Sequence, residues 1–202
     1  MKRDFNLIIA GIGGQGLLTL LKILSEAALF EGKDVKTSEL HGLSQRGGSV
    51  KVHFRLGREV FSPLVLQGQA DLIIALEIQE ALKVSYFASR ERGTIFVLND
   101  FFVPVSGKRL PQKISSQKKK EVLKKLKKFS KEVMMVPAVD ICQKEFGNSL
   151  TSGVFLLAFA LDKKLIPLQE KSVIKAIKKI IPQKYLELNL ETLKLVRKLP
   201  KI

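Results

Sequence analysis

The sequence predicts an α/β fold with three layers, in which a mostly parallel sheet carries an inserted β-hairpin and is followed by a helical C-terminal tail. Residues 5–10 form a continuous apolar run, which is typical of a strand covered on both faces. Residues 49–56 alternate strictly between apolar and polar side chains, which is typical of a half-buried strand. The last third of the chain repeats its apolar residues at helical spacing.

The first three expected elements have a Rossmann-like order. The apolar strand over 5–10 leads into a helix expected over 15–31, because the apolar residues recur there at helical spacing and stop at Gly32. A second strand is expected over 34–39. A strand, a helix and a strand in this order indicate a βαβ unit and a parallel sheet.

The expected hairpin interrupts this order. Residues 49–56 ("SVKVHFRL") form its first strand, and 57–63 ("GREVFSP") is expected to return as its second strand. The parallel order then resumes with an apolar strand over 70–77, a helix over 78–89 and a strand over 93–100.

The rest of the chain is expected to be mainly helical. A loop containing proline and glycine precedes a lysine-rich helix over 117–131, and a short strand follows over 133–138. Three helices separated by prolines are expected over 150–162, 168–181 and 183–199. The sequence has no internal repeat, so we expect a single domain over 1–202, with a core over 4–165 and a helical tail over 166–202.

The positive charge is concentrated in one segment. The formal net charge is +16, and residues 108–131 hold eleven of the 35 basic residues but only one acid. The lysine-rich segment is either the solvated face of a helix or a docking patch for nucleic acid or an acidic protein. Nucleic acid is the less favoured partner, because the chain has two tyrosines and no tryptophan for base stacking.

The cysteine content limits the redox chemistry of the chain. Cys142 is the single cysteine, and one thiol cannot supply the ligands of an iron–sulfur cluster, so no metal site is expected. The apolar runs are too short for a signal peptide or a membrane span. We therefore expect a cytoplasmic protein with no membrane contact.

A glycine-rich turn follows the first strand. Gly11, Gly13 and Gly16 fit the pattern G-x-G-x-x-G between a strand and a helix, which binds dinucleotides in many enzymes. Glu39, at the end of the second strand, lies near the place of the acid that binds a ribose hydroxyl. The same glycines also occur where a helix packs closely on a sheet without a ligand. A stand-alone NAD(P)-dependent oxidoreductase is therefore kept as an alternative function.

A second glycine-containing loop follows the second strand. Because ligands of open α/β sheets bind beside the carboxyl ends of strands, this loop is expected to share an edge with the glycine turn. Neither histidine of the chain is assigned to catalysis, since no orienting acid is identified and Cys142 is far away in sequence. The hydrogen-bonding side chains and glycines of the loop are His41, Ser44, Gln45, Arg46, Gly47 and Gly48.

These two segments resemble a known family. "GIGGQGLLTLLKILSEAALFEGKDVKTSELHGLSQRGGSVKVHFRLG", followed by "SPLVLQGQADLIIALEIQEAL", is similar to the gamma-type subunits of the 2-oxoacid:ferredoxin oxidoreductases. Within that family, "HGLSQRGGSV" with "SPL" after the hairpin favours the beta subunits of indolepyruvate ferredoxin oxidoreductases over the pyruvate- and 2-oxoglutarate-type relatives. The resemblance is strong over residues 5–85 and thinner towards the C-terminus.

The resemblance implies a non-catalytic subunit. A large partner subunit would bind thiamine diphosphate and carry the iron–sulfur clusters. The complex would convert an aryl 2-oxoacid and coenzyme A to an acyl-CoA, carbon dioxide and reduced ferredoxin. The chain alone would bind no cofactor and would be inactive. The residues that the resemblance places at the interface, close to the active site or the coenzyme A path, are Gly11, Gly13, Gly14, Gln15, Gly16, His41, Ser44, Gln45, Arg46, Gly47, Gly48, Glu77 and Glu80.

A third hypothesis comes from the charge alone. In it the chain is a basic adaptor, and residues 108–131 dock an acidic partner such as ferredoxin.

Overall fold

A computed structural model describes residues 4–42, 47–103 and 116–199. The strands are β1 (Phe5–Ile12), β2 (Asp34–His41), β3 (Ser49–Gly57), β4 (Leu72–Ala75), β5 (Ile95–Asn99) and β6 (Glu132–Val136). The helices are α1 (Leu17–Phe30), α2 (Ile78–Lys83), α3 (Ser116–Leu126), α4 (Ala138–Phe146), α5 (Ser152–Asp162), α6 (Glu170–Ile180) and α7 (Gln183–Lys198), and a 3-10 turn, η1, spans Ser85–Phe87.

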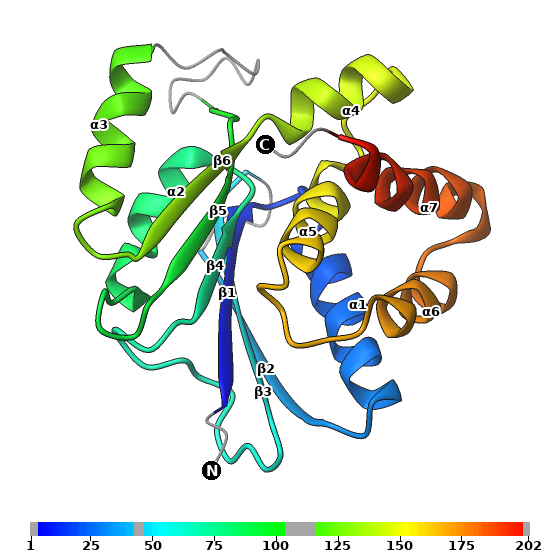
Figure 1. Ribbon diagram of the computed structural model, residues 1–202, viewed down its shortest axis with the longest axis horizontal. Helices are drawn as coiled ribbons and strands as arrows, with labels where there is room; N and C mark the ends of the chain where they lie inside the picture. The colour runs from blue at the N-terminus through cyan, green and yellow to red at the C-terminus, as the bar shows by residue number, and fades with distance from the viewer. Residues whose placement is uncertain (1–3, 43–46, 104–115, 200–202) are drawn as a thin grey trace.

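The six strands form one mixed sheet between two layers of helices (Figure 1). The strand order is β2-β3-β1-β4-β5-β6, and β1, β4, β5 and β6 run parallel to one another. Helices α2 and α3 cover one face, and α1 and α5 cover the other, with α6 and α7 behind them. The predicted three-layer α/β fold with a mostly parallel sheet and helical C-terminal tail is confirmed.

The hairpin is present, but the prediction of its second strand was wrong. The partner of β3 is the preceding strand β2, which pairs with it from Asp34 opposite Gly57 to His41 opposite Val50. Residues 58–63 do not return along the sheet, because the Val60 side chain turns into the protein and its amide donates to the Asp34 carboxylate at 2.8 Å. The other edge of β3 pairs antiparallel with β1, so the inserted strand separates β1 from β2.

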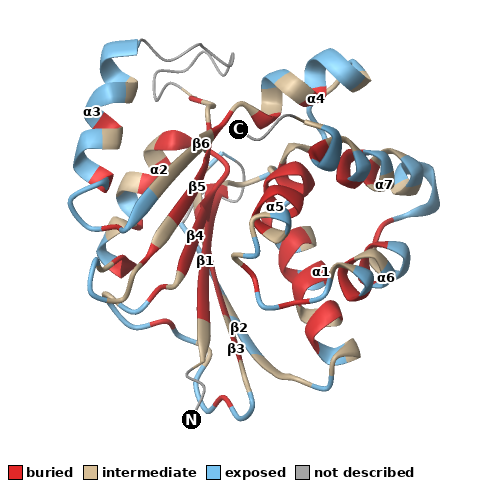
Figure 2. Cartoon of the chain, in the orientation of Figure 1, coloured by how far each residue is buried: buried red, intermediate tan, exposed pale blue. Residues whose placement is uncertain are grey.

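The core lies on both faces of the sheet (Figure 2). In β1, Leu7 and Ile9 face the layer of α1 and α5, whereas Ile8 and Ala10 face the layer of α2 and α3, and all four are fully buried. The continuous apolar run predicted as a doubly covered strand is therefore confirmed. The alternation in β3 is confirmed as well, since its four apolar side chains all join the layer of α1 and α5.

Two predicted helices end earlier than expected. α2 stops at Lys83, and the chain tightens into η1, where the Ser85 hydroxyl donates to the Leu82 carbonyl at 2.8 Å. α3 stops at Leu126, whose carbonyl accepts a hydrogen bond from the Ser130 hydroxyl at 2.9 Å. Both hydroxyls satisfy carbonyls that a longer helix would have bonded internally.

Helix α4 was not predicted. It has only nine residues, and it ends at Gly147 in the left-handed conformation with φ of 71°. The three expected C-terminal helices correspond to α5, α6 and α7. α6 packs on α1, and α7 packs on α5. The division into a core over 4–165 and a tail over 166–202 stays a prediction.

None of the helices in the described ranges is both long enough and apolar enough to cross a membrane.

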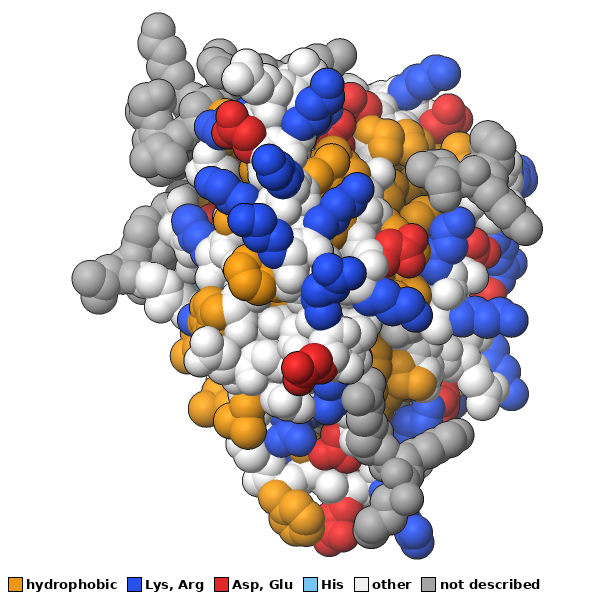
Figure 3. Space-filling model, turned by 60° about the vertical axis from the view of Figure 1, so that its left-hand side comes forward, with side chains coloured by type: hydrophobic (Ala, Val, Ile, Leu, Met, Phe, Trp, Pro, Cys, Tyr) orange, Lys and Arg blue, Asp and Glu red, His pale blue; other side chains and the backbone are white. Residues whose placement is uncertain are grey.

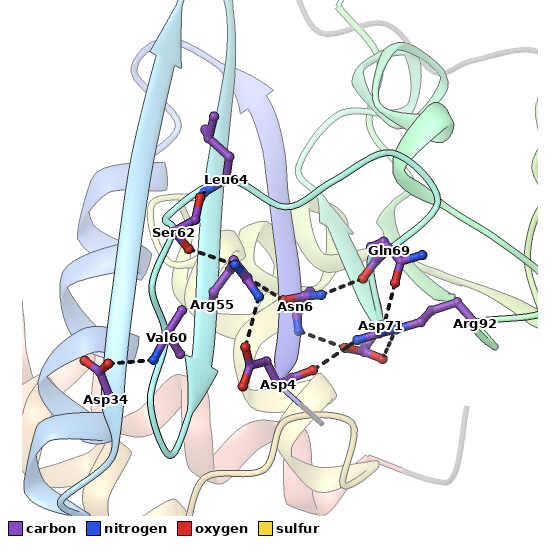
Figure 4. Close-up of polar contacts among 10 residues, drawn as sticks. All are labelled: Asp4, Asn6, Asp34, Arg55, Val60, Ser62, Leu64, Gln69, Asp71 and Arg92. Carbon is purple, nitrogen blue, oxygen red and sulfur yellow. Dashed lines mark hydrogen bonds and ion pairs between the residues drawn. The ribbon is translucent and has the colours of Figure 1, made fainter. Parts of the chain in front are cut away.

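An arginine network ties the ends of three strands together at the sheet edge where β1 begins (Figure 4). Arg55 of β3 lies opposite Asn6 of β1, donates to its amide oxygen at 2.9 Å and donates to the Asp4 carboxylate at 2.9 Å. Arg92 donates twice to the Asp71 carboxylate, at 2.8 Å in both bonds. The Asp71 carboxylate also accepts from the backbone amide of Asn6 at 2.8 Å. Because a slip of one residue would separate Arg55 from Asn6 and Asp4, these two contacts favour the observed register of β3 against β1.

His53 is a buried histidine on the opposite face of β3 from the apolar set. Its Nδ1 accepts from the Val65 amide at 3.0 Å, and the ring packs edge-on against Phe87 with centroids 5.1 Å apart. Burial, with a smaller effect of the Lys51 charge, lowers the pKa of His53 to about 4. The folded protein therefore holds this imidazole in its neutral form.

His53 should make the protein less stable in mild acid. The pKa of His53 is about 6.5 in the unfolded chain, so the stability from the neutral ring is complete above pH 6.5 and is lost as the pH falls towards 4. The loss should approach roughly 3 kcal/mol. Urea unfolding at several pH values measures it. His53→Asn keeps an acceptor for the Val65 amide and should remove this pH dependence, with His41→Asn at the exposed histidine as the control. An unchanged slope in His53→Asn would contradict the assignment.

Candidate functional site

Three connections meet at the sheet edge where β1 and β4 end. The glycine turn follows β1, the loop from β2 leads into the start of β3, and the segment after β4 enters α2. Because β3 is antiparallel to β1, Ser49 pairs with Ile12 at this edge. The Gly13 amide donates to the Gly48 carbonyl at 2.9 Å. The expected meeting of the two glycine-containing loops at one edge is thus observed for the described residues.

The glycine turn is closed by hydrogen bonds within its own chain. The Gln15 side-chain oxygen accepts from the Ile12 backbone amide at 2.7 Å, and the Gln15 backbone amide donates to the Ile12 carbonyl at 3.1 Å. Gly14 and Gly16 have φ of 100° and 80°, conformations that favour glycine. A Cβ on Gly11 would lie 2.7 Å from the Gln15 side-chain oxygen. The turn therefore needs glycine for its own closure, before any ligand is considered.

Glu77 caps the start of α2. Its side chain is 1% exposed, and one carboxylate oxygen accepts from the amides of Gln79 and Glu80 at 2.7 and 3.0 Å. The other oxygen accepts from the Val103 amide at 3.3 Å. Burial raises the pKa of Glu77, and the three amide hydrogen bonds oppose that effect. Glu77 thus holds the segment after β4 in place at the site.

A three-residue polar cluster joins the start of β3 to α2. The Ser49 hydroxyl donates to Glu80 Oε1 at 3.0 Å, and Lys83 Nζ donates to both Ser49 Oγ and Glu80 Oε1 at 2.6 Å. Glu80 is nearly buried, with 5% of its side chain exposed, whereas 55% of the Lys83 side chain is exposed. The cluster, which we call the Ser49 clasp, attaches the end of the second loop to the helix that Glu77 caps.

The second loop is only partly described. His41 is exposed, and its Nε2 lies 3.4 Å from a Glu39 carboxylate oxygen. Gly47 has φ of 74°. Ser44, Gln45 and Arg46 lie outside the described residues. The structure therefore brings the glycine turn, Gly48 and Glu77 to one edge, and it places His41 at the end of the outer strand β2.

The geometry around Glu39 differs from that of a dinucleotide site. In such sites the acid that binds the ribose lies on a strand adjacent to the glycine turn. Here β3 lies between β1 and β2, which puts Glu39 two strand spacings, or roughly 10 Å, from the β1 backbone. The amides of Ile12, Gly13 and Gln15 already donate within the chain. These features do not fit the expected mode of dinucleotide binding.

An open groove with a volume of about 480 Å³ begins beside the glycine turn. It lies between the first residues of α1, the first residues of α5 and the turn from α6 to α7. Its wall is mainly apolar, with Leu20, Val154 and Tyr185 among the lining side chains, and Lys22 contributes a charge. The groove extends the candidate site from the sheet edge onto the helical layer.

The described residues include no group of three or more histidine, cysteine or carboxylate side chains placed to hold a metal ion. Cys142, the one cysteine of the sequence, is fully buried, and burial raises the pKa of its thiol. The chain therefore offers no ligand set for an iron–sulfur cluster in the part that the structure describes.

Glu80 was identified from the sequence, but its contacts with Ser49 and Lys83 in the Ser49 clasp were not predicted. The spacing of Glu80 and Lys83 on one helix is a local signal for an ion pair and could have been read from the sequence. The contact of Ser49 with Glu80 spans 31 positions, and no local pattern encodes it.

A family model described as "Pyruvate ferredoxin/flavodoxin oxidoreductase" matches residues 6–199. Among curated proteins, the chain is 35% identical to indolepyruvate oxidoreductase subunit IorB of Archaeoglobus fulgidus, over 94% of this chain and 92% of the relative. It is 30% identical to the subunit of the same name from Thermococcus kodakarensis, over 96% and 94%. A common gamma subunit of the pyruvate/ketoisovalerate oxidoreductases of Pyrococcus abyssi is 29% identical, over 83% and 82%.

Solved structures share the fold at lower identity. The gamma subunit of a keto/oxoacid ferredoxin oxidoreductase from Geobacter sulfurreducens superposes with a TM-score of 0.66 and 18% identity over 95% of both chains. A pyruvate oxidoreductase subunit from Thermotoga maritima gives 0.66 and 20% over 96% of both chains. All of this chain superposes on 32% of a 2-oxoglutarate:ferredoxin oxidoreductase chain from Magnetococcus marinus, with a TM-score of 0.66 and 20% identity.

Gly11→Ala should lower the free energy of unfolding by about 1–3 kcal/mol. The new Cβ would lie 2.7 Å from the Gln15 side-chain oxygen, which is closer than van der Waals contact. In a Gln15→Ala background the same substitution should cost less, since its closest clash is removed. Gly42→Ala is the matched control, because a Cβ there would meet its nearest atom, the Ser49 carbonyl oxygen, at 3.9 Å. Urea unfolding of the four variants measures these costs. Equal losses for Gly11→Ala in both backgrounds would contradict the proposed closure of the turn by Gln15.

Proposed function

This chain belongs to the pyruvate ferredoxin/flavodoxin oxidoreductase family, and we propose that it is the non-catalytic subunit of an enzyme that oxidises aryl 2-oxoacids such as indolepyruvate. The complete enzyme would decarboxylate the oxoacid, transfer the acyl group to coenzyme A and pass the electrons to ferredoxin. The large partner subunit would supply thiamine diphosphate and the iron–sulfur clusters.

The assignment to aryl 2-oxoacids depends on one observation. The relatives named as indolepyruvate oxidoreductase subunits are 30–35% identical over more than nine-tenths of the chain, whereas the pyruvate/ketoisovalerate subunits are 28–29% identical over 83% of it. The full-length match to the first group, which includes the C-terminal helices, supports the narrower substrate class.

The residues of this chain do not fit the redox groups of such a complex. The single thiol, Cys142, is fully buried, and no metal-ligating cluster is found among residues 4–42, 47–103 and 116–199. The bond-making steps would therefore take place on the partner subunit. This chain would contribute a shaped surface beside them.

We assign that surface to the edge where the glycine turn, the second loop and α2 meet. Gly14, Gly16, His41 and Gly47 are exposed there and can contact another chain. Beneath them, Gln15, Glu77 and the Ser49 clasp hold the three segments in fixed positions. A surface that is rigid before assembly loses little conformational entropy when a partner binds. The predicted interface roles of Ser44, Gln45 and Arg46 belong to the same proposal.

A stand-alone NAD(P)-dependent enzyme is not favoured. The inserted β3 separates Glu39 from the glycine turn, and three amides of the turn region are used within the chain. Calorimetric titration with NAD⁺ and NADP⁺ at millimolar concentrations provides the direct comparison, and we expect no binding heat.

The purified chain should show no oxidation of indolepyruvate by itself, because it lacks groups for the redox chemistry. Combining it with the large subunit that co-purifies from the native organism should restore coenzyme A-dependent reduction of an electron-accepting dye. The large subunit alone is the control, and indolepyruvate and pyruvate should be compared as substrates. Full activity from the large subunit alone would contradict the proposal.

A further inference from the structure

The outer face of α3 and the turn after it is strongly basic. Between positions 116 and 132 the chain has eight lysines and only two glutamates. Two of these lysines are engaged: Lys119 pairs with Asp100, and Lys118 lies over the Phe102 ring with Nζ 4.2 Å from its centroid. The other six are exposed, and no ion pair joins them to an acid among the described residues: Lys120, Lys124, Lys125, Lys127, Lys128 and Lys131.

The side of the molecule that carries α3 shows this charge directly (Figure 3). Lysine and arginine side chains gather on the face that this view brings forward, with few acidic side chains between them. Only Val122 and Leu126 anchor α3 in the core. Lys120 and Lys124 lie four residues apart on α3, and like charges at this spacing destabilise a helix, so this pair does not stabilise α3.

An apolar hollow lies beside the lysines. Phe129, in the turn between Lys128 and Lys131, is 50% exposed, and Tyr86 of η1 is 43% exposed. Both line an open pocket of about 340 Å³, together with Gln67, Gly68, Ser85 and Ala88. Protein-docking surfaces often combine an aromatic anchor with a polar rim, whereas a helix face that only meets water does not need such an anchor.

We propose that this basic face docks the acidic electron-acceptor protein of the complex, a ferredoxin. The six exposed lysines would steer and hold an acidic surface, and Phe129 and Tyr86 would receive an apolar side chain of the acceptor. The electrons would pass from the partner subunit's clusters to the acceptor, and this chain would only position the acceptor. The inference rests on the proposed function, because it requires an assembled oxidoreductase.

Nucleic acid is the less suitable partner. Recognition of single strands uses aromatic side chains between basic ones on which successive bases stack. The two exposed rings of the proposed surface, Phe129 and Tyr86, line one pocket instead of alternating with the lysines, and the chain has no tryptophan.

The test is the kinetics of the assembled complex with ferredoxin and, separately, with a small dye. A combined variant with Lys124→Glu, Lys125→Glu, Lys127→Glu and Lys128→Glu should raise the KM for ferredoxin about tenfold or more at low salt. The dye-coupled rate should stay unchanged. Phe129→Ala alone should also raise this KM, with little dependence on salt. The matched control reverses four exposed lysines of α6 and α7, Lys171, Lys178, Lys194 and Lys198, and should change neither value.

The readouts separate the two proposals. An unchanged KM for ferredoxin in the α3 variant, with dye reduction intact, would overturn the docking inference and leave the proposed function standing. A variant that no longer co-purifies with the large subunit would also overturn it, because the face would then be a subunit interface. Absence of dye reduction in the wild-type complex would contradict the proposed function itself.

Discussion

The position of β3 between β1 and β2 is the constraint on which the rest of the structure depends. Because β3 runs antiparallel to both neighbours, Ser49 starts it beside the glycine turn, and Gly48 can bond to the Gly13 amide. The same insertion moves Glu39 away from that turn. At the opposite edge, the hydrogen bonds of Arg55 to Asn6 and Asp4 favour the register that keeps these contacts in place. A turn that has the spacing of a dinucleotide site is thereby closed by its own chain.

The sequence predicted what is encoded locally. The apolar strand at β1, the alternation in β3 and the three C-terminal helices follow from side-chain periodicity, and the glycine turn follows from its spacing. The prediction of a return strand over 57–63 was wrong because strand pairing is not encoded locally. β3 pairs instead with the preceding strand β2, over eight residue pairs. Helix α4 has only nine residues, too few for its side chains to show a clear helical periodicity in the sequence. The exposed part of the candidate site was predictable, but the Ser49 clasp beneath it was not, since its members meet only in the folded chain.

The polar side chains beneath the candidate site hold backbone segments in place. Glu77 and Gln15 bond to backbone amides, and the buried Glu80 bonds to Ser49 and Lys83, so each of these side chains holds a segment in place. Such an arrangement suits a subunit that presents a preorganised surface to a catalytic partner. The proposed docking of an acidic acceptor uses α3, the turn after it and Tyr86 of η1.

The most direct test of the proposed interface is amide hydrogen exchange, measured on the chain alone and on the chain assembled with its large subunit. We predict slower exchange on assembly at residues 11–16, 47–49 and 77–83, because the partner would cover the edge where these segments meet. Exchange that slows elsewhere in the chain but stays unchanged in all three segments would contradict the assignment of this edge to the catalytic subunit.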